Sequence, residues 1–259
     1  MSTPFLTMSD VRFAAGDRTI LSGIDLSLES GRIYGLVGPN GSGKSTLMKI
    51  MARQHAATGG KLALEGKDAS AWSGREFARK IAYMPQFTPA TDGMTVRELV
   101  ALGRFPWHGT LGRFGKADHA LVDDAIARTE LEDFADRPVA NMSGGERQRA
   151  WIAMMLAQDA SCLLLDEPTS ALDLAHQASM LSLVESLSHE RGLTVVIVLH
   201  DINLAARHCD EIIALNRGRI SAKGTPEEIM QAERLQSIFG VGMGVFTHPA
   251  RGEPVSYLL

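Results

Sequence analysis

Three features of this 259-residue chain predict an α/β fold with a mostly parallel sheet. A short aliphatic run leads into a glycine-rich loop and then a helix, as in a strand–loop–helix unit. Later aliphatic runs end in polar residues, as buried parallel strands do. Between about residues 94 and 160 the pattern changes from strands to helices. The predicted fold is therefore one domain over 1–259, with an inserted α-helical subdomain and an N-terminal antiparallel β layer.

The antiparallel layer is predicted over residues 5–34. Ile24, Leu26 and Leu28 alternate with polar residues, which is typical of a half-buried strand. Phe13, on the strand before it, could stack on an adenine ring, since a flat apolar side chain offers a base its π-face. The alternative is an ordinary core position, which residue statistics alone favour.

The segment 38–45 fits the pattern G-x-x-x-x-G-K-[ST], whose backbone N–H groups surround the phosphates of a nucleoside triphosphate. Lys44 can reach the outer phosphates, and the hydroxyl of Ser45 can coordinate Mg²⁺. A strand over 32–37 enters the loop, and a helix from Thr46 leaves it with its positive N-terminus toward the phosphates. These residues predict a phosphate site made by Gly38, Pro39, Asn40, Gly41, Ser42, Gly43, Lys44 and Ser45.

Bulk composition excludes some classes of function. The net charge of −4 and a pI near 6.1 argue against nucleic acid held on a broad basic surface. The longest apolar run, from Ala150 to Ala157, is too short to span a membrane. The N-terminal sequence lacks the pattern of a signal peptide. Cys162 and Cys209 are expected to be reduced, buried thiols of a cytosolic protein, with a disulfide as the less favoured alternative.

Polar side chains follow three predicted strands at their carboxyl ends, where open α/β sheets bind ligands. They are Gln86 after the strand 81–84, Asp166 and Glu167 after 162–165, and His200 after 194–199. Asp166 suits a Mg²⁺ held through water, and Glu167 can orient or deprotonate an attacking water. The alternatives are a solvated glutamine, a helix-capping acidic pair and a structural histidine.

The helical block contains a candidate docking surface. Thr95 and Glu98 form a capping box at the start of a helix through Leu102. The following segment, 103–109, is predicted to be a loop holding three aromatic rings near arginine, which is unusually apolar for exposed chain. It either packs against its own helices or contacts a partner. Another helix is predicted from Asp118 to Glu130.

A second helix start carries two glycines. Ser143 and Glu146 form the S-x-x-E pattern of a capping box, ahead of a helix to about Gln158. Gly144 and Gly145 in its first turn each cost about 1 kcal/mol of helix stability relative to alanine. Bare N–H groups at a helix N-terminus bind anions, which predicts a second phosphate site. The chain is expected to end with a hairpin over 212–221, then a helix from Pro226 and a flexible C-terminus.

Along the chain the motifs follow the order 38–45, Gln86, Met142–Glu146, Asp166–Glu167, Ser170–Asp173 and His200. This combination resembles the ATP-binding subunit of ABC transporters, over nearly the whole chain. The signature Met142–Glu146 differs from the usual LSGGQ only at its first and last residues. The resemblance implies a P-loop NTPase core, ATP and Mg²⁺ as cofactors, and an aromatic residue on adenine, which favours that role for Phe13. It implies nucleotide contacts from the loop 38–45, Thr46, Ser143, Gly144, Gly145, Glu146 and Asp173.

The same resemblance implies roles for the remaining residues. Two copies would enclose two ATP molecules head to tail, with Ser143 and Gly145 of one copy on the γ-phosphate held by Lys44 of the other. Glu167 would be the general base, His200 would contact the γ-phosphate, and Asp173 would lie across the dimer interface. The metal would be held by Ser45, Asp166 and Gln86, and Gln86 would couple it to the membrane partner.

A narrower likeness is to the ATPases of iron-siderophore, haem and cobalamin importers, and within them to the ferric-hydroxamate type. It rests on the segments 103–109, 146–153 and 171–177. It implies multi-spanning permease subunits, an indirect substrate-binding protein and a peripheral position on the cytoplasmic side of the inner membrane. The alternatives are a haem or cobalamin importer, a soluble ABC ATPase of DNA repair or translation, and a small-molecule kinase. The last would need neither the signature glycines nor His200.

Overall fold

A computed structural model describes residues 3–91, 93–109, 113–170 and 172–259. Met1, Ser2 and Ala171, which is part of the predicted Ser170–Asp173 motif, lie outside the described residues. The chain divides into two compact units. Unit 1 comprises Met1–Ala71 and Glu185–Leu259, and unit 2 comprises Trp72–Val184.

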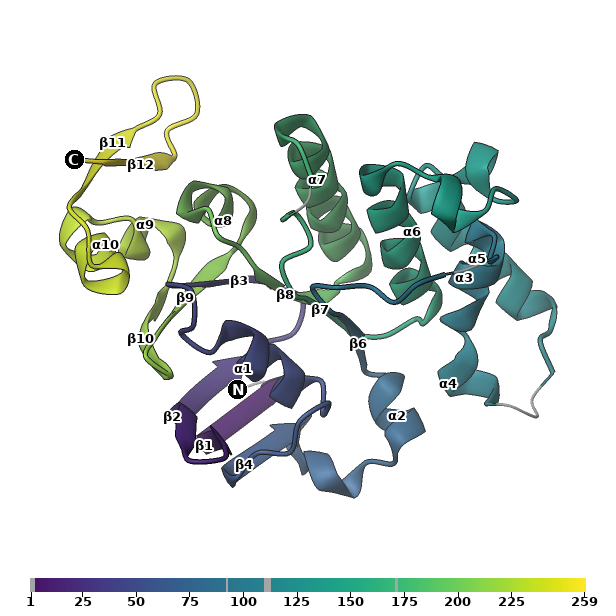
Figure 1. Cartoon of the computed structure of the whole chain (residues 1–259), viewed down its shortest axis with the longest axis horizontal. Helices are drawn as coiled ribbons and strands as arrows, with labels where there is room; N and C mark the ends of the chain where they lie inside the picture. The colour runs from purple at the N-terminus through teal and green to yellow at the C-terminus, as the bar shows by residue number, and fades with distance from the viewer. Residues whose placement is uncertain (1–2, 92, 110–112, 171) are drawn as a thin grey trace. The chain divides into compact units, whose positions relative to one another are not determined.

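Unit 1 contains the predicted antiparallel layer (Figure 1). Its strands, in the order β2-β1-β4-β5, are β1 (Leu6–Ala15), β2 (Arg18–Leu28), β4 (Gly59–Leu64) and β5 (Lys67–Asp68). Ile24, Leu26 and Leu28 are buried while Asp25 and Ser27 between them are exposed. The alternation therefore predicted both the strand and its inward face correctly, because successive side chains point to opposite faces.

The parallel part of unit 1 is centred on β3, the strand that enters the glycine-rich loop. The strand order is β10-β9-β3-β8, and β3 runs parallel to both β8 and β9. All residues of β3 and β8 are buried, as expected for strands covered on both faces. The four strands are β3 (Ile33–Val37), β8 (Thr194–Val198), β9 (Glu211–Asn216) and β10 (Arg219–Gly224).

The C-terminus is ordered, so the expected flexible tail is wrong. After α8 (Ile202–His208), the chain forms α9 (Pro226–Ile229), α10 (Ala232–Phe239) and a hairpin of β11 (Met243–Thr247) with β12 (Pro254–Leu258). The side chain of Asn203 on α8 accepts from the Ser256 N–H at 2.7 Å and donates to its carbonyl at 3.1 Å. These two hydrogen bonds join β12 to α8, and no local sequence pattern predicts them.

Unit 2 pairs β6 (Ile81–Met84) in parallel with β7 (Cys162–Leu165). Its helices α3, α5 and α6 pack against one another, and the division between units falls within α7. The helices are α2 (Gly74–Ala78), α3 (Val96–Leu102), α4 (Phe105–His108), α5 (Lys116–Arg128), α6 (Gly144–Ala157) and α7 (Leu174–Arg191). The remaining helices are α1 (Lys44–Met51) and the 3₁₀ turns at 69–71, 132–134 and 139–141.

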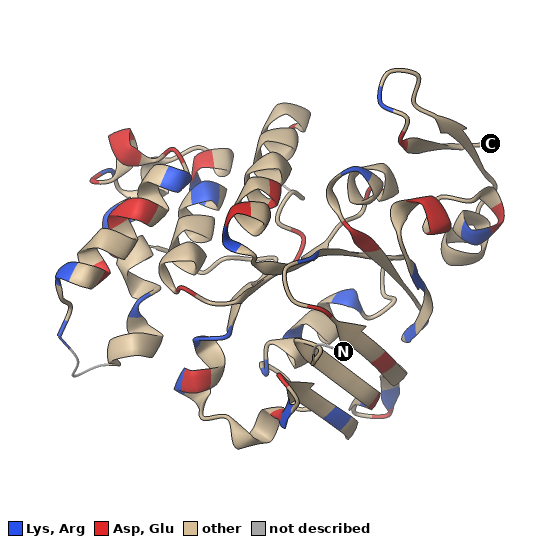
Figure 2. Cartoon of the chain, turned by 180° about the vertical axis from the view of Figure 1, so that it is seen from behind, with Lys and Arg blue, Asp and Glu red and all other residues tan. Residues whose placement is uncertain are grey.

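The predicted loop over 103–109 is wrong in part, because residues 105–108 form α4. Pro106 stands at the beginning of this short helix, where its missing N–H has no intrahelical partner to lose. The capping boxes predicted at Thr95 and Ser143 are both confirmed. Figure 2 shows basic and acidic residues interspersed on the helices of unit 2, as in the pair Arg128–Asp124 on α5.

Cys162 and Cys209 are free and buried, as predicted. Burial raises the pKa of both thiols. Among the described residues, no helix combines the length and the apolar character needed to cross a bilayer.

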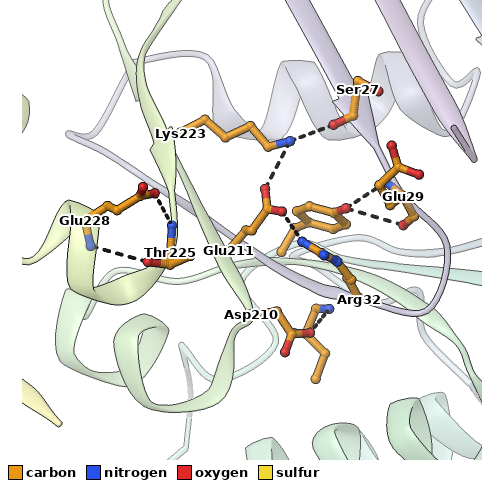
Figure 3. Close-up of polar contacts among 10 residues, drawn as sticks. Ser27, Glu29, Arg32, Asp210, Glu211, Lys223, Thr225 and Glu228 are labelled. Carbon is orange, nitrogen blue, oxygen red and sulfur yellow. Dashed lines mark hydrogen bonds and ion pairs between the residues drawn. The ribbon is translucent and has the colours of Figure 1, made fainter. Parts of the chain in front are cut away.

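A charged cluster fastens the entry of β3 to β9, β10 and the end of β2 (Figure 3). Glu211 pairs with Arg32 at 2.5 Å and with Lys223 at 3.0 Å, and Lys223 also donates to the Ser27 carbonyl at 2.8 Å. The hydroxyl of Tyr34 accepts from the Glu29 N–H at 2.7 Å, and burial raises its pKa to about 12. The cluster therefore holds the strand that presents the loop 38–45.

Replacing Glu211 by glutamine is expected to lower the free energy of unfolding by about 1–2 kcal/mol, because two cations lose a largely buried counter-charge. Urea denaturation of the purified protein measures the change. Asp123→Asn, which breaks an exposed pair with Arg97, serves as the control and should stay within about 0.5 kcal/mol of wild type. Equal effects of the two variants would contradict a structural role for the cluster.

Candidate functional site: a glycine-lined anion loop and an acidic strand end

The loop 38–45 of unit 1 packs its backbone where side chains would not fit. A Cβ on Gly38 would lie 2.0 Å from the Leu215 carbonyl oxygen, and a Cβ on Gly43 2.8 Å from a methyl of Leu21. Both residues also have φ in the left-handed region, at 140° and 105°. Gly41, in contrast, has no atom within 4 Å of its Cβ position. Two glycines are thus required by packing, and the third borders open space.

The polar groups of this loop fit a bound polyphosphate. The Lys44 side chain is buried, and its ammonium donates to the carbonyls of Gly38 at 2.9 Å and Pro39 at 3.1 Å. The Ser42 hydroxyl is buried with no hydrogen-bond partner among the described residues, a situation that costs about 1–3 kcal/mol unless a ligand supplies one. Helix α1 begins at Lys44 with no side-chain cap, so its first N–H groups can face an anion.

Phe13 borders a pocket of about 380 Å³ in unit 1, lined also by Thr19, Leu21 and Arg219. The ring of His55 stacks on Phe13 with centroids 5.3 Å apart and planes inclined by 14°. This spacing leaves no room for a base between the two rings. A base stacking on Phe13 would therefore use the pocket side, with His55 behind the ring.

His200 stands after β8 in unit 1 and is exposed. It borders a pocket of about 460 Å³ with Asp201, Asn203 and the C-terminal hairpin. Asp201 caps α8 by accepting from the Asn203 N–H at 2.7 Å. The loop at 38–45, Thr46 on α1, Phe13 and His200 are therefore the predicted site residues found in unit 1.

Unit 2 carries the acidic pair at the end of β7. Asp166 is buried, and one of its oxygens lies 3.3 Å from the Tyr83 hydroxyl. Burial, reinforced by the Asp166 carboxylate, raises the pKa of Tyr83. Glu167 has a φ of 53°, an uncommon conformation for a residue with a side chain, and its carboxylate accepts from the Gln86 amide at 2.6 Å. The structure thus brings Gln86 and Glu167 together, as their positions after β6 and β7 suggest.

The second predicted helix start lies in unit 2, at α6. The Ser143 hydroxyl accepts from the Glu146 N–H, and the Glu146 carboxylate accepts from the Ser143 N–H at 2.8 Å. That second bond lowers the pKa of Glu146. Gly144 has no atom within 4 Å of its Cβ position, whereas Gly145 lies against the ring of His176. Asp173 accepts from the backbone N–H of His176 and is 2.7 Å from its Nδ1, contacts that lower the pKa of Asp173.

Ser45 and Asp166 offer the hydroxyl and carboxylate oxygens that Mg²⁺ prefers, and Mg²⁺ commonly keeps several waters beside one or two protein ligands. The donor chemistry therefore fits magnesium. Ser45 belongs to unit 1 and Asp166 to unit 2.

Gln86 also borders a pocket of about 460 Å³ within unit 2, together with Phe87, Trp151 and Leu172. The Phe87 side chain is 83% exposed, so an apolar ring stands beside this pocket. Exposed apolar groups around a hollow are typical of partner surfaces.

Trp107 of α4 is held within unit 2. Its indole N–H donates to the Gln158 carbonyl at 2.8 Å, and the guanidinium carbons of Arg79 and Arg104 lie 4.6 and 4.9 Å from the centroid of its ring. Burial opposes the charge on Asp118, yet hydrogen bonds from Gly115, His108 and Arg104 outweigh this effect and lower the pKa of Asp118.

Phe105, also on α4, is 54% exposed. Phe105, rather than Trp107, is the aromatic residue of this segment that is available to a partner.

Sequence reasoning missed four residues near these groups: His55, Tyr83, Phe87 and His176. The contacts of His55 with Phe13 and of Tyr83 with Asp166 join segments that are separate in the chain, and Phe87 is recognised only by its exposure beside the pocket. His176 alone had a signal, since it lies in the segment 171–177.

A family model described as ABC transporter matches residues 21–170, more than half of the chain. The chain belongs to this family, and the fold and the loop define its class as an ATP-binding ATPase subunit, as the sequence predicted. The likeness to importer ATPases is confirmed by two relatives, each 40% identical. One is the iron(3+)-hydroxamate import ATP-binding protein FhuC of Bacillus subtilis (strain 168), over 96% of this chain and 93% of that protein. The other is the hemin import ATP-binding protein HmuV of Pseudomonas entomophila (strain L48), over 96% and 98%.

Solved structures agree on the fold. One, described as an inward-facing metal-chelate type ABC transporter, has a TM-score of 0.86 and 27% sequence identity. It covers 99% of this chain, and this chain covers 98% of it.

Replacing Trp107 by alanine is expected to lower the free energy of unfolding by about 2–3 kcal/mol, because a packed indole, its hydrogen bond and two cation–π contacts are lost. Phe105→Ser removes an exposed ring from the same short helix and should change it by less than about 1 kcal/mol. Thermal and urea unfolding of both variants measure the difference. A Trp107→Ala protein as stable as wild type would show that the ring is free for another role.

Proposed function

We propose that this protein is the ATP-hydrolysing subunit of an ABC importer that takes up an iron(III)-siderophore of the hydroxamate type. The single observation that carries the ATPase part is the loop 38–45, whose buried Ser42 hydroxyl has no hydrogen-bond partner in the described part of the chain and whose glycines leave the backbone bare. The relative named for iron(3+)-hydroxamate import supports the cargo.

Within this proposal the residues divide the work on ATP. Phe13 stacks on the adenine, residues 38–46 hold the phosphates, and Lys44 pairs with the outer ones. Ser45, Asp166 and Gln86 would hold magnesium, which would neutralise charge on the phosphates when bound. Glu167 takes a proton from the attacking water, and His200 donates to the γ-phosphate. The bond from Gln86 to Glu167 supports this assignment, since it orients the carboxylate.

In this proposal the N-terminus of α6 binds an anion only when two copies of the chain meet. Ser143, Gly144, Gly145 and Glu146 would face the triphosphate bound by another copy, and Asp173 would lie across that interface. The exposure of Ser143 and Gly144, with nothing near the Cβ position of Gly144, supports an external anion there. Each molecule would then supply half of two ATP sites.

The membrane partners in this proposal are multi-spanning permease subunits, fed by a substrate-binding protein that does not touch this chain. The protein would lie peripherally on the cytoplasmic side of the inner membrane. The pocket beside Gln86, with Phe87 at its edge, supports a docking site that senses the metal through Gln86. The exposed Phe105 on α4 extends the candidate surface.

A haem or cobalamin cargo is the second candidate, because the hemin-import relative is as similar as the hydroxamate-import one. Cargo does not contact this chain, so identity at this level does not separate the two. A soluble role in DNA repair or translation is less well supported, since the net charge is −4 and acidic residues are interspersed with basic ones (Figure 2).

Glu167→Gln is expected to abolish ATP hydrolysis while ATP stays bound and a dimer accumulates, because the amide keeps the shape but cannot accept the proton. Phosphate release and size-exclusion chromatography with and without ATP measure the two effects. The control is Asp159→Asn, which neutralises a carboxylate just after α6 that is not part of the proposed nucleotide site. Wild-type turnover by Glu167→Gln would refute the general base, and an ATP-loaded monomer would refute the paired sites.

A strain lacking this gene, complemented with wild-type or variant protein, is expected to take up radioactive iron from hydroxamate siderophores. Phe87→Ser and Phe105→Ser should each lower uptake, because docking loses an apolar contact while the nucleotide residues stay intact. ATP hydrolysis by the purified variants is the control. Normal uptake by both variants would contradict the docking surface, and uptake of haem or cobalamin alone would move the cargo to the second candidate.

A further inference from the structure

The ring of His176 lies directly against Gly145 at the start of α6. A Cβ on Gly145 would be 2.6 Å from Cδ2 of His176, 3.2 Å from Cγ and 3.3 Å from Nε2. The neighbouring Gly144 would meet nothing within 4 Å. The two signature glycines are therefore under different constraints. Of the two, only Gly145 lies where a side chain would collide with another residue of the same unit.

Asp173 holds His176 in this position. One oxygen of its carboxylate lies 2.7 Å from Nδ1 of the ring and 2.9 Å from the backbone N–H of His176. The ring cannot turn away from Gly145 without giving up the Nδ1 bond. A short chain of contacts thus runs from Asp173 through His176 to Gly145, all within unit 2.

We propose that His176 is a positioning residue that links Asp173 to the start of α6, so that the carboxylate and the glycine N–H groups move together. The inference rests on the proposed function, in which Gly145 meets ATP held by a second copy and Asp173 lies across the same interface. A displacement of Asp173 when two copies meet would then reach Gly145 directly. His176 itself does not touch the nucleotide in this scheme.

A purely structural role makes a different prediction. Asp173 would then serve only to cap the first turn of α7 through the His176 backbone N–H, and the imidazole ring would be dispensable. Replacing the ring would leave both ATP affinity and dimer formation unchanged. Because 54% of the His176 side chain is exposed, replacing it should cost little fold stability.

The test uses the full-length Glu167→Gln protein, whose ATP-dependent dimer is measured by size-exclusion chromatography over a series of ATP concentrations. His176→Ala is expected to raise the ATP concentration for half dimerisation about tenfold, a change typical of one lost coupling contact. Binding of a fluorescent ATP analogue at a protein concentration too low for dimers should change by less than about twofold, because the loop 38–45 is intact.

Two conservative variants separate the halves of the link. His176→Asn keeps a donor for Asp173 without a ring on Gly145, whereas His176→Phe keeps a flat ring without the donor. Both should impair dimerisation if the link must be complete. In the wild-type Glu167 background, the KM for ATP should rise together with the ATP concentration for half dimerisation, whereas kcat at saturating ATP should change less.

A double substitution supplies the decisive comparison. Gly145→Ala places a methyl against His176, so adding His176→Ala should recover part of the lost dimerisation, while the same addition to Gly144→Ala should recover none. Two results would overturn the inference. One is that Gly145→Ala and the double variant Gly145→Ala/His176→Ala dimerise equally poorly. The other is that His176→Ala alone dimerises normally. Failure of the Glu167→Gln parent to dimerise would instead count against the proposed function.

Discussion

The arrangement of the candidate site depends on the close approach of the loop 38–45 to β2 and β9. The carbonyl of Leu215 occupies the space where residue 38 would carry a side chain, and Leu21 does the same for residue 43. The turn after β9 completes the attachment, because the Gly218 N–H donates to the Ser42 carbonyl and the Gly218 carbonyl accepts from the Ser22 N–H, both at 2.9 Å. With its carbonyls held from behind, the loop can direct its N–H groups outward, which is the arrangement an anion requires.

The two helix N-termini proposed as anion sites, at α1 and α6, differ in the charge that lies beside them. At α1 the positive charge is buried, since Lys44 is enclosed by carbonyls of its own loop. At α6 the N-terminus is neutralised in part by its own capping carboxylate, Glu146, and a phosphate there would approach exposed backbone. A helix N-terminus that already interacts with a carboxylate of its own chain binds a phosphate less strongly than an N-terminus beside a lysine of its own chain. This asymmetry agrees with a primary site at α1 and a completing contact at α6, as the proposed function requires.

The sequence predicted those parts of the fold that local chemistry determines. Alternation predicted the inward face of β2, capping boxes predicted the starts of α3 and α6, and the glycine pattern predicted the tight loop before α1. It failed where a distant residue decides: Asn203 turns the C-terminus into an ordered hairpin by pairing with Ser256, and the segment 103–109 becomes helical at 105–108 while Trp107 bonds to Gln158. The stacking of His55 on Phe13 joins β1 to the segment after α1 and belongs to tertiary structure alone, so it leaves no periodic trace in the sequence.

Glu167 shows how the candidate site uses strain that no motif reveals. A left-handed backbone costs a residue with a side chain about 1–2 kcal/mol, and glycine would remove that cost. Glycine would also remove the carboxylate that accepts from Gln86. Asp166 before it is buried at the end of β7 and Pro168 after it has a fixed φ, so the chain has little freedom to relax at residue 167. If Glu167 is the base, as proposed, this conformation fixes the direction of its carboxylate before the substrate arrives, so that less reorganisation is needed during the reaction.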